Sequence, residues 1–224
     1  TREGQLNLSR EDILFFGTPY EDEVNVNSTR VTRVSGTDVW DLSRAEYEGR
    51  LQAQQVAGFL KRYVPGFENT HIVQTGTTIG VRESRRILGE YVLTANDILE
   101  ARRFDDIIAH GSYPIDIHNP TGAGTLLRRV PHNETYDIPL RCLIPRGVEN
   151  LLTAGRCISG THEAQASYRI IPISMATGQA AGVCAALSIK QGIVPRKMEY
   201  QAVRDELLRQ GAILRRREKA PETT

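Results

Sequence analysis

Residues 151–189 read LLTAGRCISGTHEAQASYRIIPISMATGQAAGVCAALSI, and the rest of the chain is organised around this segment. The apolar run at 148–153 leads into it and predicts a strand that ends at Gly155-Arg156. A polar loop follows, and Pro172 then introduces a helix rich in alanine and glycine. A strand end, a polar loop and a small-residue helix start can together hold a flat ligand with polar edges. The segment therefore predicts one side of a ligand site.

The composition is that of an ordinary soluble protein. The chain has 224 residues, a formal net charge of +1 and 25% charged residues, enough for one large domain or two small ones. The near-neutral charge gives no reason to expect a nucleic acid or an anionic membrane as partner. The cysteines Cys142, Cys157 and Cys184 lack CxxC spacing and are typical of small core residues in a reducing compartment. We therefore expect a cytoplasmic protein.

Residues 173–189 carry no charged side chain, which raises the question of a membrane span. The segment is at the short end of the roughly 17–25 residues that a span needs, and it contains few large apolar side chains. We therefore expect no span. No secretory signal precedes the fold, but the chain opens with Thr1 rather than Met, which fits a piece of a longer protein.

Hydrophobic periodicity and turn residues predict alternating strands and helices along the chain. The clearest element is an amphipathic helix at 41–63, which Asp41 or Ser43 can cap. The loop at 118–124 contains Gly122-x-Gly124 but lacks the order of a phosphate-binding fingerprint, so we interpret it as a flexible loop. The other expected elements are a hairpin or meander within 1–35, one or two strands at 71–81, a short helix at 94–103, strands at 107–117 and 136–141, and a helix at 198–217.

An arginine cluster occupies the sequence GVRESRRILGEY at 80–91. It contains Arg82, Arg85 and Arg86. A guanidinium group matches a carboxylate in two-point geometry, so the cluster is a candidate site for an acidic substrate or for a ligand edge. A solvated strand edge with ion pairs accounts for the same residues equally well.

The helix after Pro172 has two notable features. Gly178, Gly182 and Ala186 lie four residues apart, so one face is nearly bare backbone and favours close packing. The free N–H groups expected at 173–176, together with the helix dipole, suit a partial negative charge. A reduced flavin carries such charge at its N1/C2=O edge, and a helix pointed there would tune that cofactor.

The blocks AGRCISGTHEA, SYRIIP and MATGQAAGVCAAL strongly resemble the C-terminal flavin-binding segment of the FAD-dependent oxidoreductase family. That family is distantly similar to the fumarate reductase and succinate dehydrogenase flavoproteins. GVRESRRILGEY and YDIPLRCLIPRGVENLL look like the substrate-domain motifs of the same family, and all matched blocks lie within 80–187. Family members start with a strand–GxGxxG–helix unit that holds the ADP half of FAD, and this sequence contains none.

The resemblance therefore implies the C-terminal part of a flavoprotein with an α+β fold. We expect a substrate or cap region at 1–147, built of a β-sheet with helices. The last strand and helix of an incomplete α/β FAD-binding domain would follow at 148–192, and a C-terminal helix and tail at 193–224. Such a chain should not hold FAD tightly by itself.

The resemblance also implies roles for individual residues. Gly155 and Arg156 should lie beside the ribityl or pyrophosphate portion of FAD, and Ser159 belongs to the same cofactor-binding set. His162 and Arg169 are the candidate catalytic residues beside the reacting face of the ring, where an imidazole can move a proton. Backbone N–H groups facing the pyrimidine edge should come from Met175, Ala176 and Thr177, and substrate contacts from Arg82, Arg85 and Arg86.

The two catalytic candidates could instead have purely structural roles. His162 could be a loop histidine bonded to backbone, and Arg169 could pair with Glu163 or another carboxylate. The parent flavoprotein would transfer a hydride between FAD and an unidentified small organic substrate, and the chain alone, without the dinucleotide-binding half, is expected to be inactive. A homo-oligomer is compatible with the sequence. A non-catalytic binding or assembly domain is the alternative function. A metal-dependent hydrolase is a weaker one, because the histidines lack HExxH or comparable spacing and we expect no metal.

Overall fold

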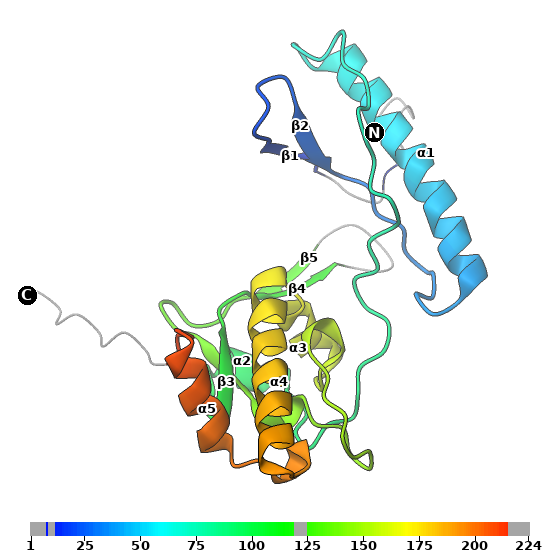
Figure 1. Cartoon of the computed structure of the whole chain (residues 1–224). Helices are drawn as coiled ribbons and strands as arrows, with labels where there is room; N and C mark the ends of the chain where they lie inside the picture. The colour runs from blue at the N-terminus through cyan, green and yellow to red at the C-terminus, as the bar shows by residue number, and fades with distance from the viewer. Residues whose placement is uncertain (1–7, 9–11, 119–124, 215–224) are drawn as a thin grey trace, which may run out of the picture. The chain divides into compact units, whose positions relative to one another are not determined.

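The computed structural model describes residue 8 and residues 12–118 and 125–214, which form two compact units. The first unit is Thr1–Ser84 with His118–Thr125, and the second is Arg85–Ile117 with Leu126–Thr224. Both combine helices with small antiparallel sheets, so the expected α+β class is confirmed (Figure 1). Most of the expected loop at 118–124 and the end of the expected helix at 198–217 lie outside the described residues.

The first unit contains a hairpin packed with one long helix. Strands β1 (Leu14–Gly17) and β2 (Val24–Asn27) pair antiparallel, which confirms a hairpin in this region. Helix α1 (Val39–Tyr63) begins two residues before the expected start, because the Asp38 side chain accepts the N–H groups of Trp40 and Asp41 at 2.9 Å. Its buried residues Val56 and Leu60 form the centre of this unit's core.

The strands expected at 71–81 are absent from the structure. Instead, side chains of α1 bond this extended segment. Arg50 donates to the Thr75 hydroxyl at 2.8 Å, and Glu46 accepts the N–H group of Ile79. Arg50 also donates to the carbonyl of Thr77 at 3.4 Å, so helix side chains rather than a partner strand bond Thr77 and Ile79.

The second unit is centred on the antiparallel pair β3 (Ile107–Gly111) and β6 (Tyr136–Pro139), with a bulge between Ile107 and Ala109. The single strand expected at 107–117 is divided into β3 and β4 (Ile115–His118), and β4 pairs with β5 (Thr125–Arg128). A 3₁₀ turn, η1 (Leu140–Cys142), follows β6 directly, so the strand expected at 136–141 ends early.

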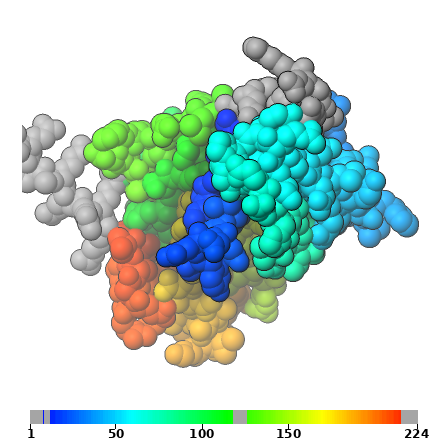
Figure 2. Space-filling view, turned by 90° about the horizontal axis from the view of Figure 1, so that it is seen from above, coloured from blue at the N-terminus to red at the C-terminus, as the bar shows by residue number. Residues whose placement is uncertain are grey.

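Two helices cover the β3–β6 pair. They are α4 (Ile171–Gln191) and α5 (Tyr200–Arg209), joined by the 3₁₀ turn η3 (Pro195–Lys197), and both contact β3 (Figure 1). Figure 2 shows them side by side in orange and red. Helix α4 ends at Gly192, whose φ of 65° is the left-handed conformation that favours glycine.

The short helix α2 (Ala95–Leu99) begins at a capping box between Thr94 and Asp97.

The extended segment 85–93 joins two other parts of this unit by backbone hydrogen bonds. On one side the N–H group of Glu90 donates to the carbonyl of Ile144 at 3.0 Å, and that of Tyr91 to the carbonyl of Arg141 at 3.2 Å. On the other side Ile87 donates to the carbonyl of Cys157 at 3.0 Å, and Leu93 to that of Ser159 at 3.2 Å. The part of the arginine cluster that belongs to the second unit, from Arg85 onward, is thereby held next to residues 157–159.

Two expectations about the organising segment are wrong. Residues 148–153 form no strand, because Gly147 and Asn150 adopt positive φ and turn the backbone, leaving Thr153 to donate to Leu143. The polar loop expected at 162–169 is mostly helix α3 (His162–Tyr168), whose first two residues are exposed and whose residues from Ala164 to Tyr168 are buried. Cys142 and Cys184 are buried as expected, whereas Cys157 is exposed.

Candidate functional site

The start of α3 and Arg86 of the arginine cluster meet at one place in the second unit. Thr161 caps α3 by accepting the N–H group of Ala164 at 3.3 Å, which leaves His162 and Glu163 exposed in the first turn. Arg86 reaches the same turn, where its Nε donates to the carbonyl of Gly160 at 2.9 Å. The structure thus brings together two of the residues expected from sequence, Arg86 and His162.

These neighbours favour the charged form of the Glu163 carboxyl group. Its own backbone N–H group and the hydroxyl of Thr161 hold the pKa of this carboxyl below its ordinary value, and His162 and Arg86 add a weaker effect in the same direction. Glu163 is therefore an anion between two basic side chains. The exposed carboxylate and imidazole of this turn lie near the half-buried guanidinium of Arg86, a set that can bind a polar substrate and exchange protons with it.

Gly155 and Thr177 lie in direct contact. Gly155 begins the 3₁₀ turn η2 (Gly155–Cys157) with a φ of +73°, and its N–H group donates to the Thr177 hydroxyl at 2.9 Å. That hydroxyl in turn donates to the carbonyl of Ser174 at 3.0 Å. A side chain at position 155 would meet only Ser174, at 3.6 Å, so the backbone here stays open to close approach. These bonds fix η2 against the first turns of α4.

The N-terminus of α4 has neither a side-chain cap nor an acidic residue in its first turn. The helix begins at Ile171, so Pro172 lies inside the first turn rather than before it. Ser174 already donates to the carbonyl of Ile170 at 2.9 Å, and by helix geometry Met175, Ala176 and Thr177 donate within the helix as well. The N–H groups without a helical acceptor are therefore those of 171 and 173, earlier than expected.

Arg169 occupies a different environment from His162. It is the C-cap of α3, and its side chain is 13% exposed. Its Nη2 donates to the carbonyl of Asp116 at 3.1 Å and lies 3.8 Å from the carboxylate of that residue. Pairing with a carboxylate was one of the open alternatives, and Asp116 is the carboxylate involved. The two candidate catalytic residues sit at opposite ends of α3, about 10 Å apart along its axis.

The remaining candidates are placed as follows. Ser159 is fully buried between the segments 85–93 and 141–146, and its hydroxyl has no partner in the described part of the chain. Arg156 and Arg85 are exposed. Arg82 is also exposed but belongs to the first unit, whereas Arg85 and Arg86 belong to the second.

Two polar networks in the second unit were missed from sequence. The Tyr136 hydroxyl is 2.7 Å from that of Ser167, which donates to the carbonyl of Tyr113 at 2.6 Å. Asp137 is 3% exposed and accepts from Arg103 and His110. Period-two alternation places 136 and 137 on opposite faces of one strand, but which partners they meet depends on segments about 30 residues away, and no sequence signal identifies those partners.

The described residues contain no group of three or more His, Cys, Asp or Glu side chains placed to hold a metal ion.

By length and composition, α4 is the one helix in the described ranges that could cross a bilayer. Core helices of soluble domains meet the same criteria, and α4 packs against β3 and α5, so this is weak evidence for a span.

The arrangement around α4 fits one edge of a flavin ring. The uncapped helix start presents the positive end of the dipole, and η2 offers an open glycine backbone bonded to the helix. Such donors suit a ring edge that carries partial negative charge. The exposed His162 begins α3, and the half-buried Arg86 of segment 85–93 bonds the carbonyl of Gly160 just before that helix, so groups for proton exchange and anion binding occur near the same turn.

Comparison with protein families gives one match. The model of the family described as FAD dependent oxidoreductase matches residues 1–207, which extends well beyond the blocks within 80–187 that suggested it. A search of curated proteins and a search of solved structures gave no match. FAD is the cofactor of the matched family. Since the match covers most of the sequence, the chain belongs to the FAD dependent oxidoreductase family.

Proposed function

We propose that this chain supplies the substrate-facing part of a cytoplasmic flavoprotein that transfers a hydride between FAD and an organic substrate. The observation that carries the proposal is the uncapped start of α4, fixed beside η2 by the 2.9 Å bond between Gly155 and Thr177. When bound, FAD would supply the hydride chemistry, while residues of this chain orient the ring edge and exchange protons with the substrate.

His162 is the better placed of the two catalytic candidates. It is exposed at the start of α3, beside the carboxylate of Glu163 and near Arg86. An imidazole in that position can move a proton while the guanidinium of Arg86 binds an anionic group of the substrate. Arg169, largely buried and joined to Asp116, would instead support the end of α3 and act through its position.

We further propose that a dinucleotide-binding part completes the site, as in flavoproteins related to fumarate reductase. One face of α4 supports this view. Ile171, Met175 and Ile189 are 75%, 70% and 83% exposed, and Gly178 and Gly182 lie between them with open space above their backbone. An apolar face of this kind is typical of a helix that packs against a further layer of structure.

The cofactor experiment compares two proteins, the chain alone and a longer version that carries a strand–GxGxxG–helix unit. We expect the chain alone to lose FAD on desalting, and the longer protein to retain about one FAD per chain. Stoichiometric FAD on the chain alone would contradict the need for a second part. A longer protein that contains the unit but binds no FAD would contradict the flavoprotein proposal itself.

The role of His162 can be tested in the FAD-loaded protein. We expect His162→Gln to lower the rate of flavin reduction by about 10²–10⁴-fold and to remove one limb of its pH dependence. His132→Gln, which changes another exposed histidine of the second unit, is the matched control and should leave the rate unchanged. Equal rates for the two variants would show that His162 moves no proton in the reaction.

A further inference from the structure

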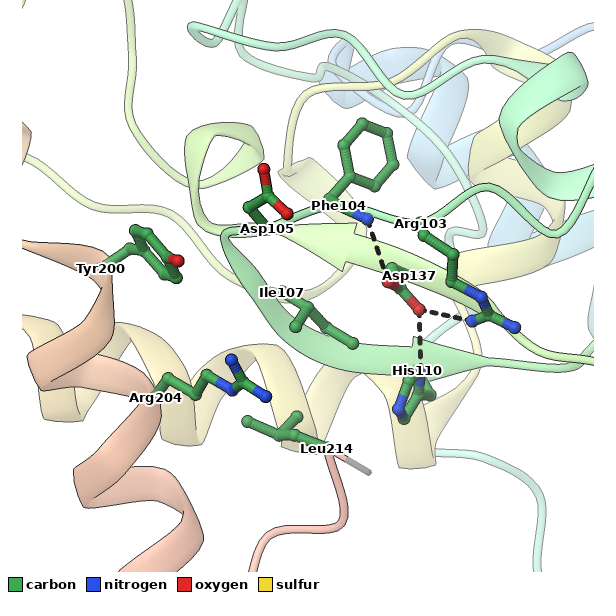
Figure 3. A pocket seen from close by; sticks show the side chains of 9 residues that line it. All are labelled: Arg103, Phe104, Asp105, Ile107, His110, Asp137, Tyr200, Arg204 and Leu214. Atoms are coloured by element: carbon green, nitrogen blue, oxygen red, sulfur yellow. Dashed lines mark hydrogen bonds and ion pairs between the residues drawn. The ribbon is translucent and has the colours of Figure 1, made fainter. Parts of the chain in front are cut away.

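A cavity of about 270 Å³ lies between α5 and the β3–β6 pair, within the second unit (Figure 3). It shares no residue with η2, α3 or the start of α4. The wall is partly polar and partly apolar. The polar part includes Arg103, His110, Asp137, Tyr200 and Arg204, and the apolar part includes Ile107 and Leu214.

Asp137 has little capacity left for a ligand. Arg103 donates to its Oδ1 at 2.7 Å, His110 Nδ1 lies 3.1 Å from the same oxygen, and the N–H group of Phe104 donates to Oδ2 at 3.0 Å (Figure 3). Burial alone raises the pKa of Asp137, but these bonds outweigh burial and lower the pKa below its ordinary value. The negative charge of Asp137 is therefore neutralised by Arg103, another residue of the wall, which also pairs with Glu134.

Arg204 has no such partner. Its guanidinium makes no hydrogen bond or ion pair with any described residue, and its Nε is shielded from solvent. The second nitrogen of His110, Nε2, is likewise shielded and without a partner among the described residues. A shielded donor without a partner is energetically costly, so an acceptor bound at the Nε of Arg204 would be stabilised at this wall. Figure 3 shows the Arg204 side chain extending between Ile107 and Leu214.

Of the charged side chains in the wall, Arg204 is the one that combines a shielded polar atom with the lack of an ion-pair partner in the described residues, which favours an anion. Arg103 and Asp137 balance each other, and Arg204 is left without an ion-pair partner in the described residues. The exposed carboxylate of Asp105 also borders the cavity, but no ion pair joins it to Arg204 in the described part of the chain. The Tyr200 hydroxyl adds a neutral donor. A planar guanidinium matches a carboxylate in two-point geometry.

The size and the apolar wall narrow the class of ligand. The volume is just below the roughly 300–1,000 Å³ of pockets for drug-sized ligands, so the occupant has to be small. Ile107 and Leu214 offer apolar surface that a bare inorganic anion would leave unused. We propose that this cavity binds a small organic carboxylate, with Arg204 as its charge partner, Tyr200 as a second donor, and Ile107 and Leu214 against its hydrocarbon part.

The proposal is tested by titrating the full chain with butyrate and following the ring ¹⁵N resonances of its histidines. We expect saturable binding with a Kd on the order of 1–10 mM and a shift of the His110 Nε2 resonance. Butyramide, which has the same shape without the charge, should not bind. Inorganic phosphate should bind at least about fivefold more weakly than butyrate, because it makes no apolar contact.

Two variants of α5 locate the site. Arg204→Gln should weaken butyrate binding at least about tenfold, and Arg204→Lys, which keeps the charge but loses the planar fork, should weaken it less. Arg209→Gln is the matched control on the same helix, because Arg209 is exposed and already paired with Glu206 at 2.6 Å. Circular dichroism checks that each variant is folded. The proposal is overturned if butyrate does not saturate, if butyramide or phosphate binds equally well, or if Arg209→Gln weakens binding as much as Arg204→Gln.

Discussion

Replacing Gly89 with alanine should destabilise the second unit, because the added methyl group has no room where three segments meet. A Cβ at this position would lie 2.7 Å from Ser159 Cβ, 3.0 Å from the carbonyl oxygen of Arg141 and 3.2 Å from that of Ile144. Ordinary contacts between such atoms are about 3.5–4.0 Å, so all three neighbours would have to move. None of them is the end of a flexible side chain.

The magnitude follows from what those neighbours hold together. The Arg141 and Ile144 carbonyls accept the N–H groups of 91 and 90 at 3.2 and 3.0 Å, so moving them stretches both hydrogen bonds. Overpacking by one methyl costs about 1–3 kcal/mol, and each weakened bond adds up to about 1 kcal/mol. We expect Gly89→Ala to lower the free energy of unfolding by about 2–4 kcal/mol.

Urea unfolding followed by far-ultraviolet circular dichroism measures this loss. Gly182→Ala is the control, because Gly182 lies in a helix with open space at its Cβ position and the change should be neutral or stabilising. The double variant Gly89→Ala/Ser159→Gly removes the closest contact and should recover at least about 1 kcal/mol relative to the sum of the single changes. A loss below about 0.5 kcal/mol for Gly89→Ala, or no recovery in the double variant, would refute the reasoning.

Three further predictions concern the same unit. Tyr136→Phe should lower the free energy of unfolding in urea by about 1 kcal/mol, because the buried Ser167 hydroxyl loses its partner at 2.7 Å. Ser167→Ala should then lower this free energy by less in the Tyr136→Phe variant than in the native protein. Folding lowers the pKa of Asp137, so its contribution to stability is fully present above its unfolded pKa of about 3.9 and is lost as the pH falls through the lower folded value. Asp137→Asn should lower the free energy of unfolding by about 1–3 kcal/mol at neutral pH. This loss should become smaller in unfolding curves measured below about pH 4. Gly178→Ala should stabilise the chain alone by about 0.5–1 kcal/mol but should weaken FAD retention in the longer protein if this face of α4 packs against the dinucleotide-binding part.

Long periodic elements were predictable from sequence, whereas short extended segments were not. The pattern at 41–63 predicted the 25-residue helix α1 to within two residues at its start, because a long helical period carries a strong signal. The segments 71–81 and 148–153 have apolar runs typical of strands, but a strand needs a partner. Side chains of α1 form hydrogen bonds with the first segment in place of a partner strand. In the second segment, positive φ at Gly147 and Asn150 turns the backbone out of the extended conformation that strand pairing needs.

The local structure of the candidate site was not predictable from the sequence. The family that the sequence blocks suggested is confirmed by a match over residues 1–207, and the structure places Arg86 beside 160–163 as well as Gly155 against Thr177. The sequence HEAQASYR was interpreted as a loop because its polar residues conceal a seven-residue helix capped by Thr161. The partner of Arg169, Asp116, is 53 residues away in the chain, a separation at which sequence patterns give no information about pairing.

The hydrogen bonds of segment 85–93 also determine when this protein can fold during its synthesis. Arg86 bonds a carbonyl 74 residues further along the chain, and its neighbours bond partners at similar separations. At about 5–20 residues per second, the ribosome needs roughly 4–15 s to supply those partners. Until residues 141–160 have been made, the backbone of 85–93 lacks its native acceptors, so the second unit should complete its fold only after those residues have emerged, with segment 85–93 among the last parts to become ordered.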